Sequence, residues 1–148
     1  MITVYWKIKN FLLSLVSKRT IGARALVLQD DHILLVKHTY MPGWYTVGGG
    51  VEPGETGLQA LTRELQEEVG IDLCEAPSIL GFYHNRSQKR DDYVIVYVCN
   101  AFKKREVVSQ EILEERWFPL NLLPHDISPA TKRRIEEYLG HRALSDQW

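Results

Sequence analysis

The chain has 148 residues, a length that suits one domain with a buried core. Apolar residues make up 45% and charged residues 25%, as in ordinary globular proteins, and the net charge of −1 argues against a strongly basic binder of duplex nucleic acid. No apolar run approaches the roughly 18 to 20 residues that a membrane-spanning helix needs. Two cysteines, Cys74 and Cys99, are too few for a disulfide scaffold. We interpret both as reduced, buried thiols and expect a cytoplasmic protein.

The start of the chain is basic and carries an apolar stripe. Apolar residues at helical spacing predict an amphipathic helix over residues 2–17, with the stripe formed by Tyr5, Ile8, Leu12, Leu15 and Val16. The apolar run is short and no small-residue cleavage site follows it, so a signal peptide is not expected. We expect the helix to pack on its own domain or on a partner subunit in a homodimer. Binding to a membrane surface is the alternative, favoured by the basic residues.

The next elements follow in chain order. Two segments rich in Val, Leu and Ile, residues 21–29 and 32–38, flank Asp30-Asp31 and predict a hairpin. Pro42-Gly43 and Gly48-Gly49-Gly50 predict loops around a short segment at residues 44–47. A helix is expected from Thr56 to Val69, because Thr56 and Gln59 can form a capping box and Gly70 is a natural stop.

Strands and one more helix are expected in the second half. Strands at residues 79–84 and 93–102 enclose the polar stretch 85–92, which we predict to be a loop. A further loop at 103–111 leads to a short strand near 116–119 and a helical turn at 120–123, and a last helix covers 128–139. The pattern predicts a mixed sheet with helices on its faces. We divide the chain into the N-terminal helix, residues 1–19, and one domain, residues 20–148.

The helix at residues 56–69 has an unusual concentration of acid. At about 100° per residue, Leu58, Leu61, Leu65 and Val69 form a buried stripe, and Glu64, Glu67 and Glu68 share its flank. Each like-charge pair at three or four residues costs an isolated helix roughly 0.2–0.5 kcal/mol, and only Arg63 offers positive charge nearby. Such a face is usually just solvated. Here a glycine-rich loop at residues 48–55 enters the helix, so a hard cation bound by carboxylates and a loop carbonyl is the stronger interpretation.

Residues 49–71 resemble the Nudix box, G-x5-E-x7-R-E-U-x-E-E-x-G-U, in which U is aliphatic. All the specified positions match: Gly49, Glu55, Arg63, Glu64, Leu65, Glu67, Glu68, Gly70 and Ile71. The resemblance implies a Nudix-like α/β/α sandwich with a mixed β-sheet over residues 20 to 140. It also implies a hydrolase, dependent on Mg²⁺ or Mn²⁺, that cleaves a phosphoanhydride bond in a nucleoside diphosphate linked to another group.

The resemblance further implies residue roles. Glu67 and Glu68 would be the main metal ligands, and Glu64 would be a further ligand or would orient or deprotonate the attacking water. The Gly48 carbonyl would complete the metal site, while Arg63 and Glu55 would hold the loop. Family members also use an acid from a later loop, for which Glu111 is the best match, with Glu114 and Glu115 as alternatives. Val47 stands where the family often has proline, so we expect a somewhat looser loop.

Substrate contacts are expected around the glycine loop. Cationic side chains should contact the phosphates, and the candidates are Arg24, Lys37 and His38. An aromatic ring could stack on a base, and the candidates are Trp44 and Tyr45. An ordinary surface charge is the alternative for each cation, and core packing for at least one of the rings. The residues around the 85–92 stretch, His84, Arg86, Lys89 and Arg90, are candidates for setting substrate choice.

The substrate itself is not readable from the sequence. Within the family that the chain resembles, residues downstream of the box mark the hydrolases of ADP-ribose, dinucleoside polyphosphates and NADH. The chain lacks these residues. A nucleotide-binding sensor on the same fold is the alternative function, but such a protein is expected to lose box glutamates and none is lost here. An interaction module built on the N-terminal helix is a third interpretation, and it is compatible with catalysis.

Overall fold

The structure is a computed structural model and describes residues 19–87 and 90–148, so the predicted N-terminal helix lies outside the described residues. The strands are β1 (Arg19–Gln29), β2 (His32–His38), β3 (Val47–Gly50), β4 (Ile71–Leu73), β5 (Ser78–Ser87), β6 (Arg90–Cys99), β7 (Phe102–Lys104) and β8 (Ile112–Pro119). The helices are α2 (Gly57–Val69) and α3 (Pro129–Tyr138). No helix among the described residues is long and apolar enough to cross a membrane.

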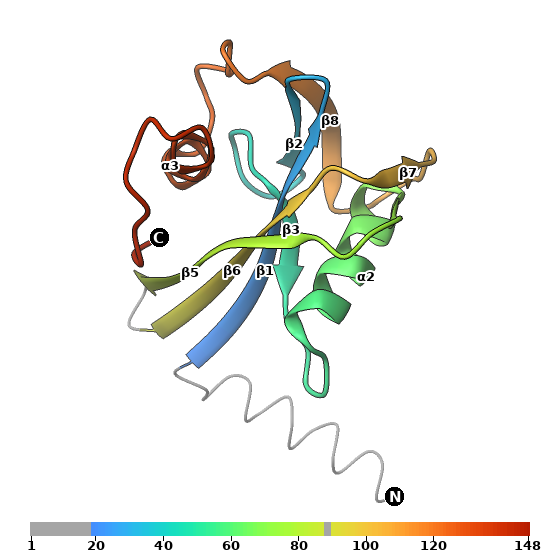
Figure 1. Cartoon of the computed structure of the whole chain (residues 1–148). Coiled ribbons are helices and arrows are strands. Elements are labelled where there is room, and N and C mark those ends of the chain that lie inside the picture. Colours follow the sequence, from blue (N-terminus) through green and yellow to red (C-terminus); the bar gives the residue numbers. More distant parts are fainter. Residues whose placement is uncertain (1–18, 88–89) are drawn as a thin grey trace, which may run out of the picture.

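The strands form a mixed sheet between the two helices (Figure 1). Its order is β5-β6-β1-β2-β8, with β3 also paired to β1, and β4 and β7 form a separate two-stranded sheet. The β1–β6 pair is parallel, whereas β1 pairs antiparallel with both β2 and β3. The expected α/β/α sandwich with a mixed sheet is confirmed.

Strand β1 is buried on both faces, which explains its continuous apolar run. Ala23, Ala25 and Val27 face α2 and pack with Leu61 and Leu65 of that helix. Leu26 and Leu28, on the other face of β1, belong to a second core. This core also contains Val94 and Val96 of β6 and Ile135 of α3. The two cores are separated by the sheet, so each helix has its own apolar layer.

One edge of β1 is shared by two strands. Residues 22–25 pair with β3 and residues 27–29 pair with β2. The predicted hairpin is confirmed, and Asp30 and Asp31 both have positive φ, at 49° and 58°, as a tight hairpin turn between twisted strands requires.

The three glycines predicted as a loop are a strand instead. Gly48, Gly49 and Gly50 pair with residues of β1, and this pairing is a tertiary contact that local sequence does not reveal. Gly48 has φ of 136°, and a Cβ there would lie 2.1 Å from the carbonyl oxygen of Ala23, so only glycine fits. Val47 is fully buried and paired with Ala25. Strand pairing therefore fixes the backbone of this segment, which we had expected to be a somewhat looser loop.

Three further expectations are corrected. The predicted loop at 85–92 is mostly strand, because β5 and β6 continue their ladder with Asn85 opposite Asp92 and Arg86 opposite Asp91. Cys74 is exposed, whereas Cys99 is buried as expected, and both are free thiols. Leu58 is exposed on the first turn of α2, so the buried stripe begins at Leu61.

The C-terminal helix is tied to the sheet by a buried polar network. Arg134 and Glu137 form a buried ion pair at 2.9 Å, and the Tyr83 hydroxyl donates to Glu137 at 2.7 Å. The last residues then run beside β5, where the His84 amide donates to the Asp146 carbonyl and the Trp148 amide donates to the His84 carbonyl. The predicted helix at 128–139 is confirmed, with Ser128 as its N-cap.

Candidate active site

Helix α2 begins and ends where its sequence predicts. The Gln59 amide donates to the Thr56 hydroxyl at 3.1 Å, and the Thr56 amide donates to the Gln59 side chain at 2.9 Å. Gly70 ends the helix in the left-handed conformation, with φ of 66°. These caps fix which turns of the helix carry the carboxylates, and therefore which direction each carboxylate takes.

Arg63 joins the glycine strand to the acidic face of α2. Its guanidinium donates to Glu55 at 2.9 Å, to Glu64 at 2.7 Å and to the Gly50 carbonyl at 3.0 Å. A Glu67 oxygen lies 3.5 Å away. The hydrogen bond from Arg63 lowers the pKa of Glu55. One partly exposed guanidinium thus holds the loop and offsets part of the acidic charge.

Glu64 lies directly against the backbone of the glycine strand. A Cβ on Gly49 would lie 2.4 Å from the Glu64 Oε1 atom, whereas a Cβ on Gly50 would meet nothing within 4 Å. Gly49 is therefore required for the approach of this carboxylate, and Gly50 is not.

Glu68 is a buried carboxylate with little compensation. It is 5% exposed and accepts one hydrogen bond, 3.1 Å long, from the Gly48 amide. Burial raises the pKa of Glu68 to about 7, although the bond from Gly48 acts in the other direction. A cation beside this group would favour its ionised form. The residue spacing predicts Glu68 on the acidic flank of the helix, whereas its burial depends on packing against distant parts of the chain.

The carbonyl of Gly48 already has a cationic partner. The Arg24 guanidinium donates to this carbonyl at 2.6 Å, while the amide of Gly48 donates to Glu68. Arg24 reaches this atom because residues 24 and 48 are directly opposed in the β1–β3 pair. A carbonyl oxygen has two lone pairs, so this contact leaves one acceptor position.

The loop after β7 brings Glu111 to the acidic helix. Glu64, Glu67, Glu68 and Glu111 line one open pocket of about 560 Å³. The end of this loop is anchored by a 2.9 Å hydrogen bond from the Thr39 amide to the Glu111 carbonyl. The structure therefore brings together all the acidic side chains that the sequence nominated for the metal.

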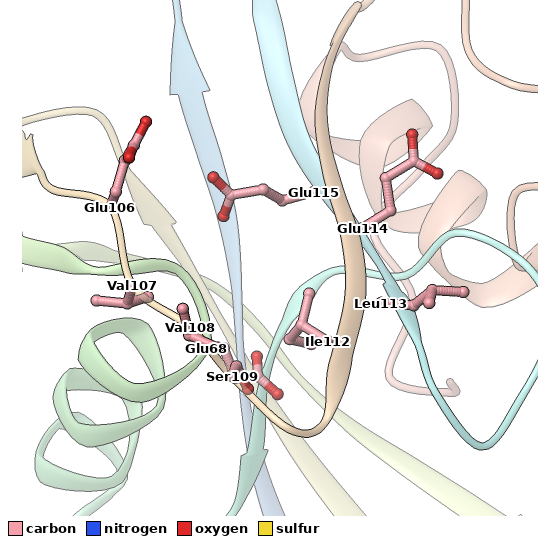
Figure 2. A pocket seen from close by; sticks show the side chains of 9 residues that line it. All are labelled: Glu68, Glu106, Val107, Val108, Ser109, Ile112, Leu113, Glu114 and Glu115. Atoms are coloured by element: carbon pink, nitrogen blue, oxygen red, sulfur yellow. The ribbon is translucent and has the colours of Figure 1, made fainter.

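The two alternatives to Glu111 have cationic neighbours. Both line an adjoining pocket, together with Glu68 and Ser109, as Figure 2 shows. Glu115 pairs with Lys104 at 2.6 Å, and Glu114 pairs with Arg116. Figure 2 also shows the side chains of Glu114 and Glu115 leaving β8 in different directions. Glu111 has no cationic side-chain partner in the described ion pairs, which favours it as the loop carboxylate.

The donor set fits a hard divalent cation by its chemistry. Carboxylate and carbonyl oxygens are the ligands that Mg²⁺ and Mn²⁺ prefer, and four carboxylates line this pocket. Among residues 19–87 and 90–148, however, no group of three or more acidic, His or Cys side chains is already arranged to hold a metal ion. Arg63 provides a physical reason, since it draws Glu64 and Glu67 towards itself.

The predicted substrate contacts fall into two groups. Lys37 lies over the ring of Trp44 and 3.5 Å from Asp126, and Trp44 is 3% exposed, so this ring is a core residue. His38 lies beside the rings of Tyr40 and Tyr45, at 5.0 and 5.6 Å between centroids. Tyr40 was not among the candidates from the sequence and is 66% exposed. Partial burial raises the pKa of its hydroxyl; the charge of Arg24 acts in the other direction, and the charges of Glu111, Glu68 and Glu64 add to the rise.

His38 is unusual because it is buried without a partner. Neither ring nitrogen has a hydrogen bond within the described residues. Burial, with a smaller contribution from Arg24, lowers the pKa of His38, so the imidazole is neutral at physiological pH. The cluster of His38, Tyr40 and Tyr45 offers aromatic surface beside the acidic pocket.

Two candidates for substrate choice, His84 and Arg86, lie away from the acidic pocket, and Lys89 lies outside the described residues. His84 bonds to Asp91 at 2.9 Å, and β5 is at the opposite edge of the sheet from β8. Neither His84 nor Arg86 lines a pocket that contains the box glutamates. The described contacts therefore do not place these two side chains with the carboxylates.

Comparison with known proteins identifies the family. A family model described as a NUDIX domain matches residues 18–138. A putative 8-oxo-dGTP diphosphatase of Bacillus subtilis is 31% identical over 120 residues, which are 80% of this chain and 79% of that protein. An ADP-ribose pyrophosphatase of Methanocaldococcus jannaschii is 30% identical over 70% of this chain and 64% of its own length. The crystal structure of a MutT NUDIX hydrolase from Burkholderia pseudomallei matches with a TM-score of 0.71 at 30% identity, over 80% of this chain and 96% of that one.

Proposed function

Because the chain belongs to the Nudix family of hydrolases, we propose that it cleaves a phosphoanhydride bond in a nucleoside diphosphate derivative at the pocket between α2 and residues 105–111. The observation that carries this proposal is the convergence of Glu64, Glu67, Glu68 and Glu111 on one pocket. Two of the relatives described above are named for nucleotide substrates, 8-oxo-dGTP and ADP-ribose. These names support the proposed class of substrate.

The acidic pocket needs a cation before it can accept phosphate. Carboxylates repel a polyphosphate, so Mg²⁺ or Mn²⁺ would be held by Glu67 and Glu68, with Glu64, Glu111 and the Gly48 carbonyl as further donors. Such an ion supplies charge neutralisation and a more acidic bound water. Within the chain, Arg63 fixes the orientation of Glu64 through its 2.7 Å bond. Glu64 and Glu111 are the groups available to take the proton of the attacking water.

The chain's other residues would position the substrate. Arg24 stands at the Gly48 carbonyl and can meet a phosphate oxygen with its remaining donors. Tyr40 and Tyr45 provide ring surface for a base, while Trp44 is held in the core. Aromatic stacking tolerates different bases, so this arrangement does not select one nucleotide.

The test is a substrate panel of nucleoside triphosphates, oxidised nucleotides, ADP-ribose and nucleotide sugars, each with Mg²⁺, with Mn²⁺ and with chelator. We expect metal-dependent release of nucleoside monophosphate or diphosphate. Glu67→Gln and Glu68→Gln should each lower kcat at least about 100-fold, on the scale of lost charge stabilisation in a transition state. Glu75→Gln, exposed and outside the pocket, is the control. Binding of nucleotides without turnover in any arm would favour the sensor instead.

A further inference from the structure

The sheet has an uncovered apolar area on the face that carries α2. Three large side chains there are exposed: Ile21 of β1 at 47%, Ile79 of β5 at 63% and Phe82 of β5 at 54%. Tyr93 of β6 lies between them, half-buried and stacked on Phe82 with ring centroids 5.4 Å apart. We call these four residues the apolar sheet patch.

Strand registers show that the patch is continuous. Ile21 is directly opposite Tyr93 in the β1–β6 pair, and Ile79 is opposite Tyr97 in the β5–β6 pair. Tyr97 belongs to the core under α2, and residues two apart on a strand share a face, so the patch extends that core beyond the helix. The first turn of α2 marks its boundary, because a Cβ on Gly57 would lie 2.9 Å from Ile95.

Neither described helix covers this area. Helix α3 packs on the other core, and α2 covers only the part of the sheet next to it. Contiguous exposed apolar surface of this kind commonly marks a contact with another segment or protein.

The position of the patch points to its occupant. Ile21 is two residues after Arg19, where the described structure begins, and the preceding segment carries the stripe Tyr5, Ile8, Leu12, Leu15 and Val16. We propose that residues 2–17 dock their apolar stripe on the apolar sheet patch of the same chain. A helix of this length spans about 24 Å and is marginal in water by itself, so it needs such a surface.

Docking within one chain is favoured over docking on a second copy. Only Ser17 and Lys18 lie between the end of the stripe at Val16 and the start of β1 at Arg19, and short tethers give effective concentrations of about millimolar. The stripe and the patch are both apolar, and Lys7 would point away from the patch on the predicted helix. The helix thereby becomes a third helical cover on the sheet, separate from the acidic pocket.

Cross-linking in the full-length chain tests this proposal. Leu12→Cys and Phe82→Cys are combined with Cys74→Ser, because Cys74 is the exposed native thiol and Cys99 is buried. A short bismaleimide should link the two cysteines within one chain, as mapped by mass spectrometry. Asn10→Cys, about 160° around the helix from Leu12, and Leu122→Cys, exposed elsewhere on the domain, should link poorly in matched pairs.

Each other outcome overturns the proposal. A cross-linked dimer would assign the patch to a second copy. No specific link, with flotation of the full-length protein on phosphatidylserine vesicles, would assign the stripe to a membrane. No specific link without flotation would leave the patch without this occupant.

Thermal melts of full-length variants give an independent readout. Leu12→Ser and Phe82→Ser should each lower Tm, and the double variant should lose clearly less than the two losses combined, because contacting residues are not additive. Fully additive losses would contradict a contact between these two side chains.

Discussion

The guanidinium of Arg24 donates a 2.6 Å hydrogen bond to the carbonyl oxygen of Gly48, the same oxygen that the family resemblance nominates as a metal ligand. A metal ion held there would therefore compete with Arg24 for one atom or share its two lone pairs. In either case the two positive charges would repel, and the charge of Arg24 also lowers the pKa of Glu68, against the larger effect of burial. The strength of metal binding should depend on this arginine.

Replacing Arg24 should separate metal affinity from substrate affinity. In Arg24→Gln the positive charge beside the site is lost, so the Mg²⁺ concentration for half-maximal activity should fall about tenfold, equivalent to about 1.4 kcal/mol. KM for the substrate should rise, since a phosphate contact is lost. Arg24→Lys keeps the charge and is the control. Weaker Mg²⁺ activation in Arg24→Gln would show that Arg24 supports the site instead of competing with the metal.

Substituting the loop carboxylate should reduce turnover selectively. Glu111→Gln is expected to lower kcat about 10- to 100-fold, as for the loss of a general base or a ligand, with little change in Tm. Glu114→Gln and Glu115→Gln are matched controls from the same part of the chain, and both should be mild because Arg116 and Lys104 already engage these carboxylates. A larger defect at either control would move the role to that residue.

Adjacent glycines should respond differently to alanine. The new methyl of Gly49→Ala would lie 2.4 Å from Glu64 Oε1, so the carboxylate must move, and we expect kcat to fall at least about tenfold while the fold persists. Gly50→Ala meets nothing within 4 Å and should be nearly silent. Steady-state kinetics and thermal melts of both variants suffice. Equal effects at the two positions would mean that Glu64 is not placed by its contact with Gly49.

His38 should make stability depend on pH. Its folded pKa lies below the unfolded value, so the unfolded chain binds more protons, and the stabilisation present above about pH 6.5 is lost as the pH falls. Urea denaturation at pH 7.5 and 5.5 should show a smaller loss of stability for His38→Phe than for the wild type. His125→Gln, at an exposed histidine, is the control and should behave as the wild type. An unchanged pH dependence in His38→Phe would show that this ring does not titrate differently on folding.

The sequence predicted those features that depend on neighbours along the chain. Thr56 and Gln59 predict the start of α2, and Gly70 predicts its end, because capping depends on residues a few positions apart. The role of Arg63 in holding the loop was implied by the family resemblance, and the structure gives its partners, Glu55 and the Gly50 carbonyl.

Features that depend on distant partners were missed or misread. Gly48 to Gly50 have the composition of a loop, and only pairing with β1 makes them a strand. The polar residues of the 85–92 stretch become a ladder because each faces a partner across β5 and β6. The burial of Glu68 and the isolation of His38 depend on packing in three dimensions, which residue spacing does not encode.

The parallel pairing of β1 with β6 also sets an order of events during synthesis. Residues 19–70 contain the glycine strand and the whole acidic helix, but β6, which lies along β1 from Arg19 opposite Asp91 to Val27 opposite Cys99, is made later. Until residue 99 has left the ribosome, β1 lacks its hydrogen-bonding neighbour on that edge. The nascent chain therefore carries its catalytic motif complete while the sheet still has an unpaired strand edge, the kind of surface that favours aggregation.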